Sequence, residues 1–337
     1  MNPSTYPGAA LIPAEPPLHS APGRRRIASK REWSDGESPT LSIIVPTFNR
    51  SQALAATIND LLRQSYRDYE LWIVDQSTPE QAMMNAAYVA KAADPRLQYL
   101  HLPTTGLPHA RNEGLRRVKG KIILFVDDDV ILLSADFLTA HVEAYNDPRI
   151  GGVTGRHVER LVPMNCRRTA CYVSWGGRTI FNLFGTERQR IGSCKGSNMS
   201  FRAAAIAQVG GFDRKTNMLE DTDFSVRVAR AGWLLMFEPD AELVHLSIDT
   251  GGVRAANKIE TEYRRFSSTA YFVLKHRGVL GTLPFVLTFT LIAISRTLRY
   301  RSIDVFLGCL GAMLKGFALA KSGADQLIEG RESVSAP

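Results

Sequence analysis

The chain has 337 residues, with 45% hydrophobic and 22% charged residues, as in an ordinary globular protein of one large domain or one domain with an appendage. A net charge of +8 favours an anionic partner such as nucleic acid, a membrane surface or a phosphate-bearing ligand. The four cysteines exclude a disulfide scaffold and a paired-cysteine metal site, and they favour a reducing compartment.

Residues 1–40 are expected to form a disordered, proline-rich leader. They hold seven of the chain's seventeen prolines and show no sustained apolar periodicity that would offset the entropy of ordering. The basic cluster Arg24–Arg26 is interpreted as solvated charge, with contact to anionic lipid headgroups as the alternative.

Order is expected to begin at "LSIIVPTFNR", where the apolar run Leu41–Val45 predicts a strand covered on both faces, ended by Pro46. Apolar residues at helical spacing follow and predict a helix. Two further strands and one further helix are predicted after it. The predicted elements after the first strand are a helix at 50–65, a strand at Tyr69–Asp75, a helix at 108–118 and a strand at 121–127. This alternation predicts an α/β fold with a mainly parallel sheet flanked by helices.

Carboxylates end two of these strands: Asp75 ends one, and Asp127, Asp128 and Asp129 follow the next. Ligands of such sheets bind at the carboxyl ends of the strands. Crowded carboxylates repel one another, and a divalent cation offsets that repulsion, so the triplet predicts Mg²⁺ or Mn²⁺ bridging to a phosphate. An acidic turn exposed to solvent is the alternative for the triplet taken alone.

The stretch "GSNMSFRAAAIAQVGGFD" predicts a polar loop at Ser197 and Asn198, followed by a short helix that ends at Gly210 and Gly211.

In "EDTDFSVRVARAGW" the apolar spacing predicts a helix with Glu220 and Asp221 at its N-terminus. Helix capping alone explains Asp221. The additional acids Glu220 and Asp223 exceed what a cap needs, and they suggest a carboxylate that takes a proton from an attacking hydroxyl. His245 ends the strand-like "AELVHL"; it is a structural hydrogen-bonding residue unless the strand returns it to the aspartates, where it would be a metal ligand.

The C-terminal third contains eighteen residues without formal charge, 278–295, between basic flanks, and then the apolar run 305–320. This length is borderline for a transmembrane helix, and helices that lie in the membrane interface fit equally well. A pair of core helices on the main domain is the third reading. We favour membrane association, with residues 251–325 helical and 326–337 a tail.

The ordered chain from Leu41 to about Leu246 resembles the family-two glycosyltransferases of the GT-A fold. The resemblance rests on "SIIVPTFNR", "LWIVDQST", "ARNEGLRRVKGKIILFVDDD", "GSNMSFR", "VGGFD" and "EDTDFSVRVARAGW", in that order. It implies a GT-A domain at 41–250 and inverting transfer of a sugar from a nucleotide-diphosphate donor to a hydroxyl acceptor. The Gln-x-x-Arg-Trp element of processive synthases is absent, which favours addition of a single sugar.

The resemblance also implies roles for individual residues. On the donor side it implies contacts to the nucleotide from Pro46, Thr47, Asp75, Arg111, Asp127 and Asp128. It further implies metal ligation by Asp127, Asp129 and His245, general-base catalysis by Asp221 with Glu220 beside it, and acceptor contacts from Ser197, Asn198 and Asp223. Gln76 stands where the family often has a second aspartate, which leaves the base of the nucleotide open.

The expected partners are a nucleotide-sugar donor, a glycan or lipid-linked acceptor and the cytoplasmic face of a membrane. A catalytically inactive scaffold of the same fold and a nucleotidyltransferase remain alternatives, although no glycine-rich phosphate loop follows the first strand. The same absence argues against a dinucleotide-binding oxidoreductase, and no aromatic-basic pattern supports nucleic-acid binding.

Overall fold

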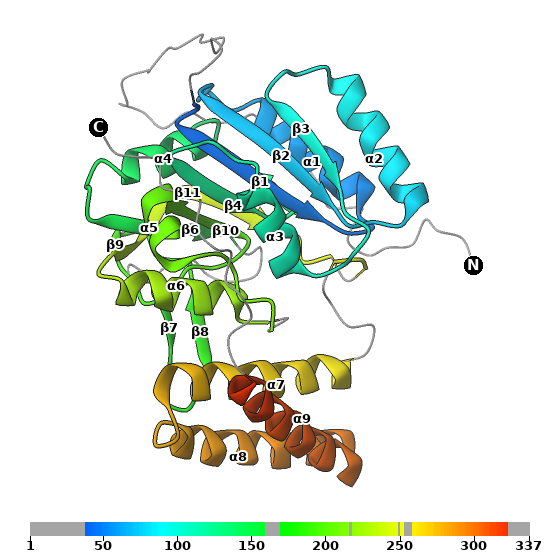
Figure 1. Ribbon diagram of the computed structural model, residues 1–337, viewed down its shortest axis with the longest axis vertical. Coiled ribbons are helices and arrows are strands. Elements are labelled where there is room, and N and C mark those ends of the chain that lie inside the picture. Colours follow the sequence, from blue (N-terminus) through cyan, green and yellow to red (C-terminus); the bar gives the residue numbers. More distant parts are fainter. Residues whose placement is uncertain (1–37, 159–168, 216–217, 249, 253–257, 323–337) are drawn as a thin grey trace.

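The computed structural model describes residues 38–158, 169–215, 218–248, 250–252 and 258–322. They form an α/β part built on one large sheet and, below it, a layer of three helices (Figure 1). The predicted leader lies outside the described residues except for 38–40, and the predicted tail at 326–337 lies wholly outside them.

The first half of the α/β part alternates strands and helices. Its elements are β1 (Leu41–Thr47), α1 (Ser51–Leu62), β2 (Tyr69–Asp75), α2 (Pro79–Ala92), β3 (Leu97–His101), α3 (Leu107–Leu115) and β4 (Ile122–Val126). Sequence analysis missed α2 and β3, whose patterns are weak for a physical reason. In α2 only Ala82 and Asn85 are buried, and β3 is a half-exposed strand at the edge of the sheet.

The prediction that Pro46 ends the first strand is wrong. β1 continues to Thr47, and Pro46 stays in parallel register with Val74 of β2. On its other side β1 pairs with β4 only from Leu41 to Ile44. Because β4 offers no partner beyond Ile44, the missing N–H of the proline leaves no ladder hydrogen bond unmade there.

The second half adds β5 (Val130–Leu132), α4 (Phe137–Ala144), β6 (Ile150–His157), β7 (Ala170–Val173), β8 (Thr179–Asn182), β9 (Gln189–Arg190), β10 (Asn198–Arg202), α5 (Ala203–Val209), α6 (Glu220–Arg230) and β11 (Leu234–His245). The sheet order is β3-β2-β1-β4-β10-β6-β11-β5, with β9 paired to β11. The pairs β1–β2, β2–β3, β1–β4 and β6–β11 are parallel, while β10, β5 and β9 pair antiparallel. The predicted mixed, mainly parallel sheet is confirmed.

Alternation of side chains along β1 separates two hydrophobic cores. Ile43 and Val45 pack on one face of the sheet with α1 and α4, and Ile44 packs on the other with α3, α5 and α6. The continuous apolar run that predicted a strand covered on both faces is explained by these two layers.

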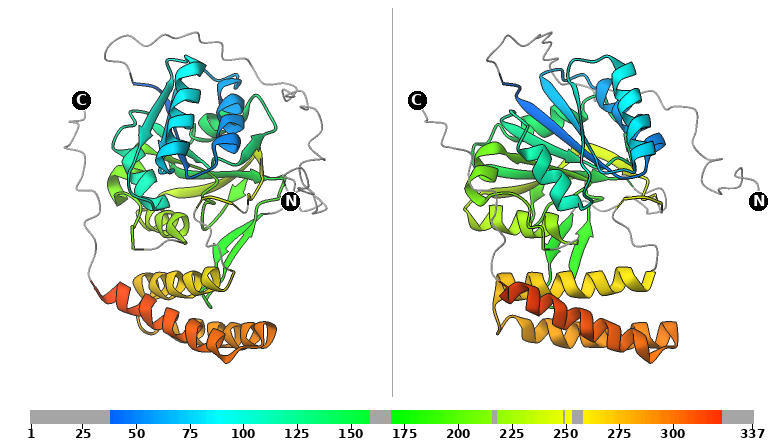
Figure 2. Two further views of the ribbon diagram at one scale, coloured as in Figure 1. Left: turned by 90° about the vertical axis from the view of Figure 1, so that its right-hand side faces the viewer. Right: turned by 45° about the vertical axis from the view of Figure 1, so that its right-hand side comes forward.

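The helical layer consists of α7 (Lys258–Arg277), α8 (Thr282–Tyr300) and α9 (Ile303–Lys321), which share a core of their own around Phe266, Phe289 and Cys309. Both α8 and α9 are long and apolar enough to cross a membrane. The alternative of two core helices is wrong, because only 17% and 22% of their apolar windows are buried. Figure 2 shows α7 facing the α/β part, with α8 and α9 on its far side.

Candidate active site

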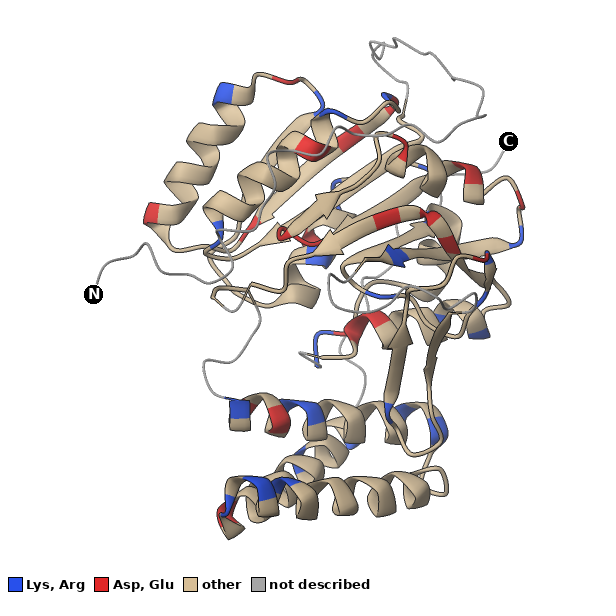
Figure 3. Ribbon diagram, turned by 180° about the vertical axis from the view of Figure 1, so that it is seen from behind, with Lys and Arg blue, Asp and Glu red and all other residues tan. Residues whose placement is uncertain are grey.

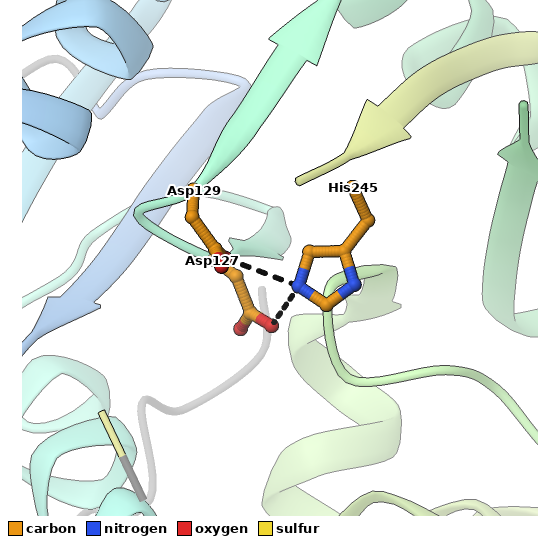
Figure 4. A group of neighbouring side chains, drawn as sticks. All are labelled: Asp127, Asp129 and His245. Carbon is orange, nitrogen blue, oxygen red and sulfur yellow. Dashed lines mark hydrogen bonds and ion pairs between the residues drawn. The ribbon is translucent and has the colours of Figure 1, made fainter. Parts of the chain in front are cut away.

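Strand pairing brings His245 to the predicted aspartates. β11 runs antiparallel to β5 with His245 opposite Val130, the residue that follows Asp129. The Nε2 atom of His245 lies 3.1 Å from Asp129 Oδ1 and 3.5 Å from Asp127 Oδ2 (Figure 4). Asp129 is buried, and Asp127 remains partly exposed at the carboxyl end of β4. We call Asp127, Asp129 and His245 the acidic group. The sequence predicted that His245 would be a metal ligand if its strand returned it to the aspartates, and the strand does so.

The donor atoms of the acidic group fit a divalent cation. One ligand atom each from Asp127, Asp129 and His245 lies within 4.8 Å of the others. Carboxylate oxygens with one imidazole nitrogen suit Mn²⁺ and, less well, Mg²⁺. Burial raises the pKa of Asp129, but the hydrogen bond from His245 and the nearby charges outweigh it, so the net shift is downward. Burial lowers the pKa of His245, and the same aspartates shift it above the ordinary value.

Asp128 is bonded to the end of β1 and to Arg50 and is not one of the three potential metal ligands. Its Oδ2 accepts a hydrogen bond from Thr47 Oγ1 at 2.6 Å, and its Oδ1 pairs with Arg50 Nη1 at 3.0 Å. Burial raises the pKa of Asp128 to about 6, opposed by the Thr47 hydroxyl and the Arg50 charge. The middle aspartate therefore joins the turn after β4 to the end of β1.

Arg50 was not predicted as a site residue, yet it connects three segments of the site. Besides Asp128, its Nη1 lies 3.2 Å from Asp129 Oδ2. Its Nη2 donates to the carbonyl of Ile248 and its Nε to that of Thr250, both at 2.8 Å. A single arginine after a strand end was the only sequence signal, and it does not show that a segment 200 residues later returns to it.

Arg111 spans the gap between the acidic group and α6. It is 1% exposed; its Nη1 donates to Glu220 Oε1 at 2.7 Å, and its Nη2 lies 3.6 Å from Asp127 Oδ1. The guanidinium also lies over the ring of Phe212. Burial, and then the charge of Asp221, raises the pKa of Glu220 to about 7, against the pull of Arg111.

Asp221 is held by the loop before β10. Its Oδ2 accepts the backbone N–H of Gly196 at 2.8 Å, and its Oδ1 accepts that of Thr222 at 2.6 Å. The capping alternative is wrong, because Leu219 is the N-cap of α6 and makes no side-chain cap bond. A Cβ on Gly196 would lie 2.8 Å from Arg111 Nη2 and 3.2 Å from Asp221 Oδ2, so a side chain at this position would displace one of these two groups.

Asp75 lies at the carboxyl end of β2 with its carboxylate already engaged. It accepts hydrogen bonds from Ser77 N and Asn85 Nδ2 at 2.7 Å and from Tyr99 Oη at 2.8 Å. Asn85 and Tyr99 belong to α2 and β3, the two elements that sequence analysis missed.

The three candidates for the acceptor side are all buried and engaged with other parts of the fold. Asn198 begins β10 rather than lying in a loop, and its amide bonds His141 and the carbonyl of Ala241 inside the fold. Ser197 is buried, with its Oγ 3.5 Å from His157 Nε2.

Asp223 is likewise buried, and it faces the helical layer. Its carboxylate pairs with Arg227 of α6 at 2.9 Å, with Lys275 at 2.7 Å and with His276 at 2.7 Å. Both Lys275 and His276 belong to α7. These contacts give Asp223 a role in joining α6 to α7.

The sheet, with two acidic residues and a histidine at its carboxyl edge facing a second pair of acids on α6, defines a protein of the GT-A class. A solved mannosyltransferase of Pyrobaculum calidifontis, in complex with GDP-Man and Mn²⁺, has this fold, with a TM-score of 0.54 and 18% identity over 88% of this chain and 80% of that one. The family profile "Glycosyl transferase family 2" matches residues 42–209, and the chain belongs to that family.

Two curated relatives resemble parts of the chain. An N-acetylglucosaminyltransferase of Azorhizobium caulinodans is 28% identical over 224 residues, which are 60% of this chain. The glycosyltransferase EpsJ of Bacillus subtilis is 38% identical over 106 residues, which are 32% of this chain. The chain spans 54% and 30% of the length of these two proteins, respectively.

Proposed function

We propose that the protein is an inverting glycosyltransferase that moves a single sugar from a nucleotide-diphosphate donor to a hydroxyl of a glycan or lipid-linked acceptor. One observation supports this most directly. The acidic group Asp127–Asp129–His245 and the α6 acids Glu220 and Asp221 face one another across Arg111. Transfer from a diphosphate leaving group requires a site for a cation that neutralises the diphosphate and a base that takes the proton of the acceptor hydroxyl, and the two groups of acids supply both.

The residues of the acidic group would hold Mg²⁺ or Mn²⁺. When bound, the cation neutralises the charge that develops on the departing diphosphate. Arg111 has its guanidinium between that position and Glu220, where it adds positive charge in a dry environment. In this mechanism Thr47, Pro46 and Asp75 line the nucleotide pocket along the ends of β1 and β2.

Asp221 is the proposed base. Its Oδ1 accepts two hydrogen bonds, from the backbone N–H and the hydroxyl of Thr222, whereas its Oδ2 accepts one, from Gly196. A carboxylate oxygen accepts about two such bonds. Oδ2 therefore keeps a lone pair for the proton of an acceptor hydroxyl, while Gly196 holds the carboxylate in one orientation.

The relatives are consistent with this proposal but leave the donor open. One relative is named as an N-acetylglucosaminyltransferase, and one solved structure contains GDP-Man. An inactive scaffold is disfavoured because the acids of both sides are present and positioned. We further propose that the chain acts at the cytoplasmic face of a membrane; the exposed apolar helices α8 and α9 support the membrane location.

Nucleotide binding provides the first test. Purified protein is melted with UDP, GDP, ADP and CDP, each with and without Mn²⁺, and one diphosphate is expected to stabilise it only with the metal. A ligand at 100 times its dissociation constant adds about 2.7 kcal/mol of stability. Asp129→Asn should remove the effect of the metal, whereas Asp147→Asn, whose carboxylate pairs with Arg149 on the surface, should not. Sugar transfer at full rate in excess EDTA would contradict the proposal.

A further inference from the structure

The helical layer carries exposed apolar residues along both α8 and α9, which no described residue covers. On α8 the exposed residues recur at spacings of four, four, three and four, and on α9 at four, three and four, so each set forms one face of its helix. We call these residues the docking face: Leu283, Leu287, Leu291, Ile294 and Leu298 of α8, with Ile303, Leu307, Leu310 and Leu314 of α9. The exposed fractions of these side chains run from 40% to 73%. Exposed apolar patches of this kind mark sites of interaction with a protein or a membrane.

The charge around the docking face is mainly positive. Residues 277–321 contain six Lys and Arg and one acid, Asp304. Figure 3 shows the basic positions on the ribbon of the helical layer. An apolar face bordered by cations complements a bilayer that contains anionic lipid, since each basic residue near such a surface contributes attraction and each buried leucine contributes transfer free energy.

The tip of the β7–β8 hairpin extends this surface. Trp175 at the tip is 77% exposed, and the Arg277 guanidinium lies over its ring. A Cβ on Gly176 would meet Thr288 of α8, so the tip packs on the helical layer itself. Val279 and Leu280, in the turn after Arg277, are 74% and 83% exposed. A tryptophan with a cation beside exposed aliphatic residues is typical of the membrane–water interface.

Packing against α7 decides how the docking face meets a bilayer. A 19-residue helix is about 28 Å long, so length alone permits α8 and α9 to span. However, α7 packs along both helices. Arg296 of α8 pairs with Glu262 at 3.3 Å, and a Cβ on Gly316 of α9 would lie 2.1 Å from the carbonyl of Ser267.

The other side of α7 is fixed to the α/β part. Lys275 pairs with Asp213 at 2.6 Å, and His276 pairs with Asp223 at 2.7 Å. If α8 and α9 crossed a bilayer, the charged helix α7 and the edge of the α/β part would have to enter it with them, at a large cost in desolvation. With the helices in the plane of the interface, α7 stays in water and separates the sheet from the lipid.

We infer that α8, α9 and the β7–β8 tip form one surface that docks in the plane of an anionic membrane and does not span it. This inference rests on the membrane location in the proposed function and specifies its geometry. The docked layer is joined through α7 and Asp223 to α6, the helix on which the proposed base lies. The acceptor that this arrangement favours is a hydroxyl presented at a lipid surface.

Vesicle binding by the full chain tests the inference. Binding is measured to phosphatidylcholine vesicles with roughly one quarter phosphatidylglycerol, and to pure phosphatidylcholine, at low and high salt. We expect binding to the anionic vesicles that weakens with salt. Leu287→Glu with Leu291→Glu should lower the partition at least about tenfold. The matched control is Met83→Glu with Met84→Glu, two exposed apolar residues on α2, which should bind like the parent.

Depth measurements separate docking from spanning. Tryptophan is introduced singly at Leu283, Leu291 and Leu298, and its quenching by brominated lipids is taken as the difference from the parent. In-plane docking predicts equal, shallow depths, whereas a middle position deeper than both ends would overturn the inference. Equal binding by the double glutamate variant, or a dimer that hides the face and ignores vesicles, would also overturn it.

The vesicle assay and the enzymatic assay can fail separately. Vesicle binding without nucleotide binding or sugar transfer would reject the proposed function and leave the docking face supported. Transfer to a soluble acceptor without vesicle binding would support the proposed function and reject the docking face. Melting temperature and nucleotide affinity, measured for every variant, should match the parent, because the substituted side chains are exposed and lie outside the acidic group.

Discussion

Replacement of Asp221 by asparagine tests the proposed base. Asparagine keeps the size of the side chain and one acceptor oxygen, but it removes the basicity. General-base catalysis typically contributes about 10²–10⁴-fold, so turnover should fall by that factor. Nucleotide affinity should change little, because the acidic group lies on the other side of Arg111.

The structure also predicts a cost in stability for this variant. Asp221 accepts hydrogen bonds on both oxygens, from Thr222 N and Gly196 N. An asparagine satisfies only one of these donors, and the other is left buried against an NH₂ group. An unsatisfied buried donor costs about 1–3 kcal/mol, so the melting temperature should fall as well.

A matched control separates the two effects. Asp213→Asn also weakens a buried carboxylate, one that accepts bonds from Tyr271, Lys275 and Lys215 N, away from the acidic group. Transfer rate, nucleotide dissociation constant and melting temperature are measured for both variants at a temperature where both stay folded. A rate for Asp221→Asn close to that of the parent, or a loss no larger than in Asp213→Asn at equal destabilisation, would refute the base assignment.

Two further predictions concern residues around the acidic group. Arg50→Gln should weaken Mn²⁺ binding about tenfold by calorimetry, because Arg50 orients Asp129 and holds the segment after His245; an unchanged affinity would show that Arg50 has no such role. Glu220→Gln should change the pH dependence of stability: with a folded pKa of about 7 against an ordinary 4.5, the parent binds more protons folded than unfolded and loses stability as pH rises through that window. The difference in melting temperature between the variant and the parent should therefore shift in favour of the variant from about pH 4.5 to about pH 7. A difference that stays constant over this range would contradict the raised pKa of Glu220.

Local patterns in the sequence determined much of this protein. The apolar runs at 41–45, 69–75 and 121–127 predicted the central strands, because strands covered on both faces are apolar almost throughout. The sequence also predicted functional roles for the acids after β4 and at the start of α6. Crowded carboxylates at the ends of buried elements repel one another unless a cation or a chemical role accounts for them. The uncharged run 278–295 and the apolar run 305–320 predicted helices that associate with a membrane.

Tertiary structure alone decided which of these groups meet. His245 reaches Asp129 only because β11 pairs with β5, and Arg50 reaches Ile248 across nearly two hundred residues. Other long-range contacts changed the roles expected for single residues. Asp223 bonds His276 of α7, and Asp221 accepts the N–H of Gly196 and is not the N-cap of its helix. Periodicity reports only which face of an element is buried. The partner across that face depends on strand order and long-range packing, which no local window of the sequence contains.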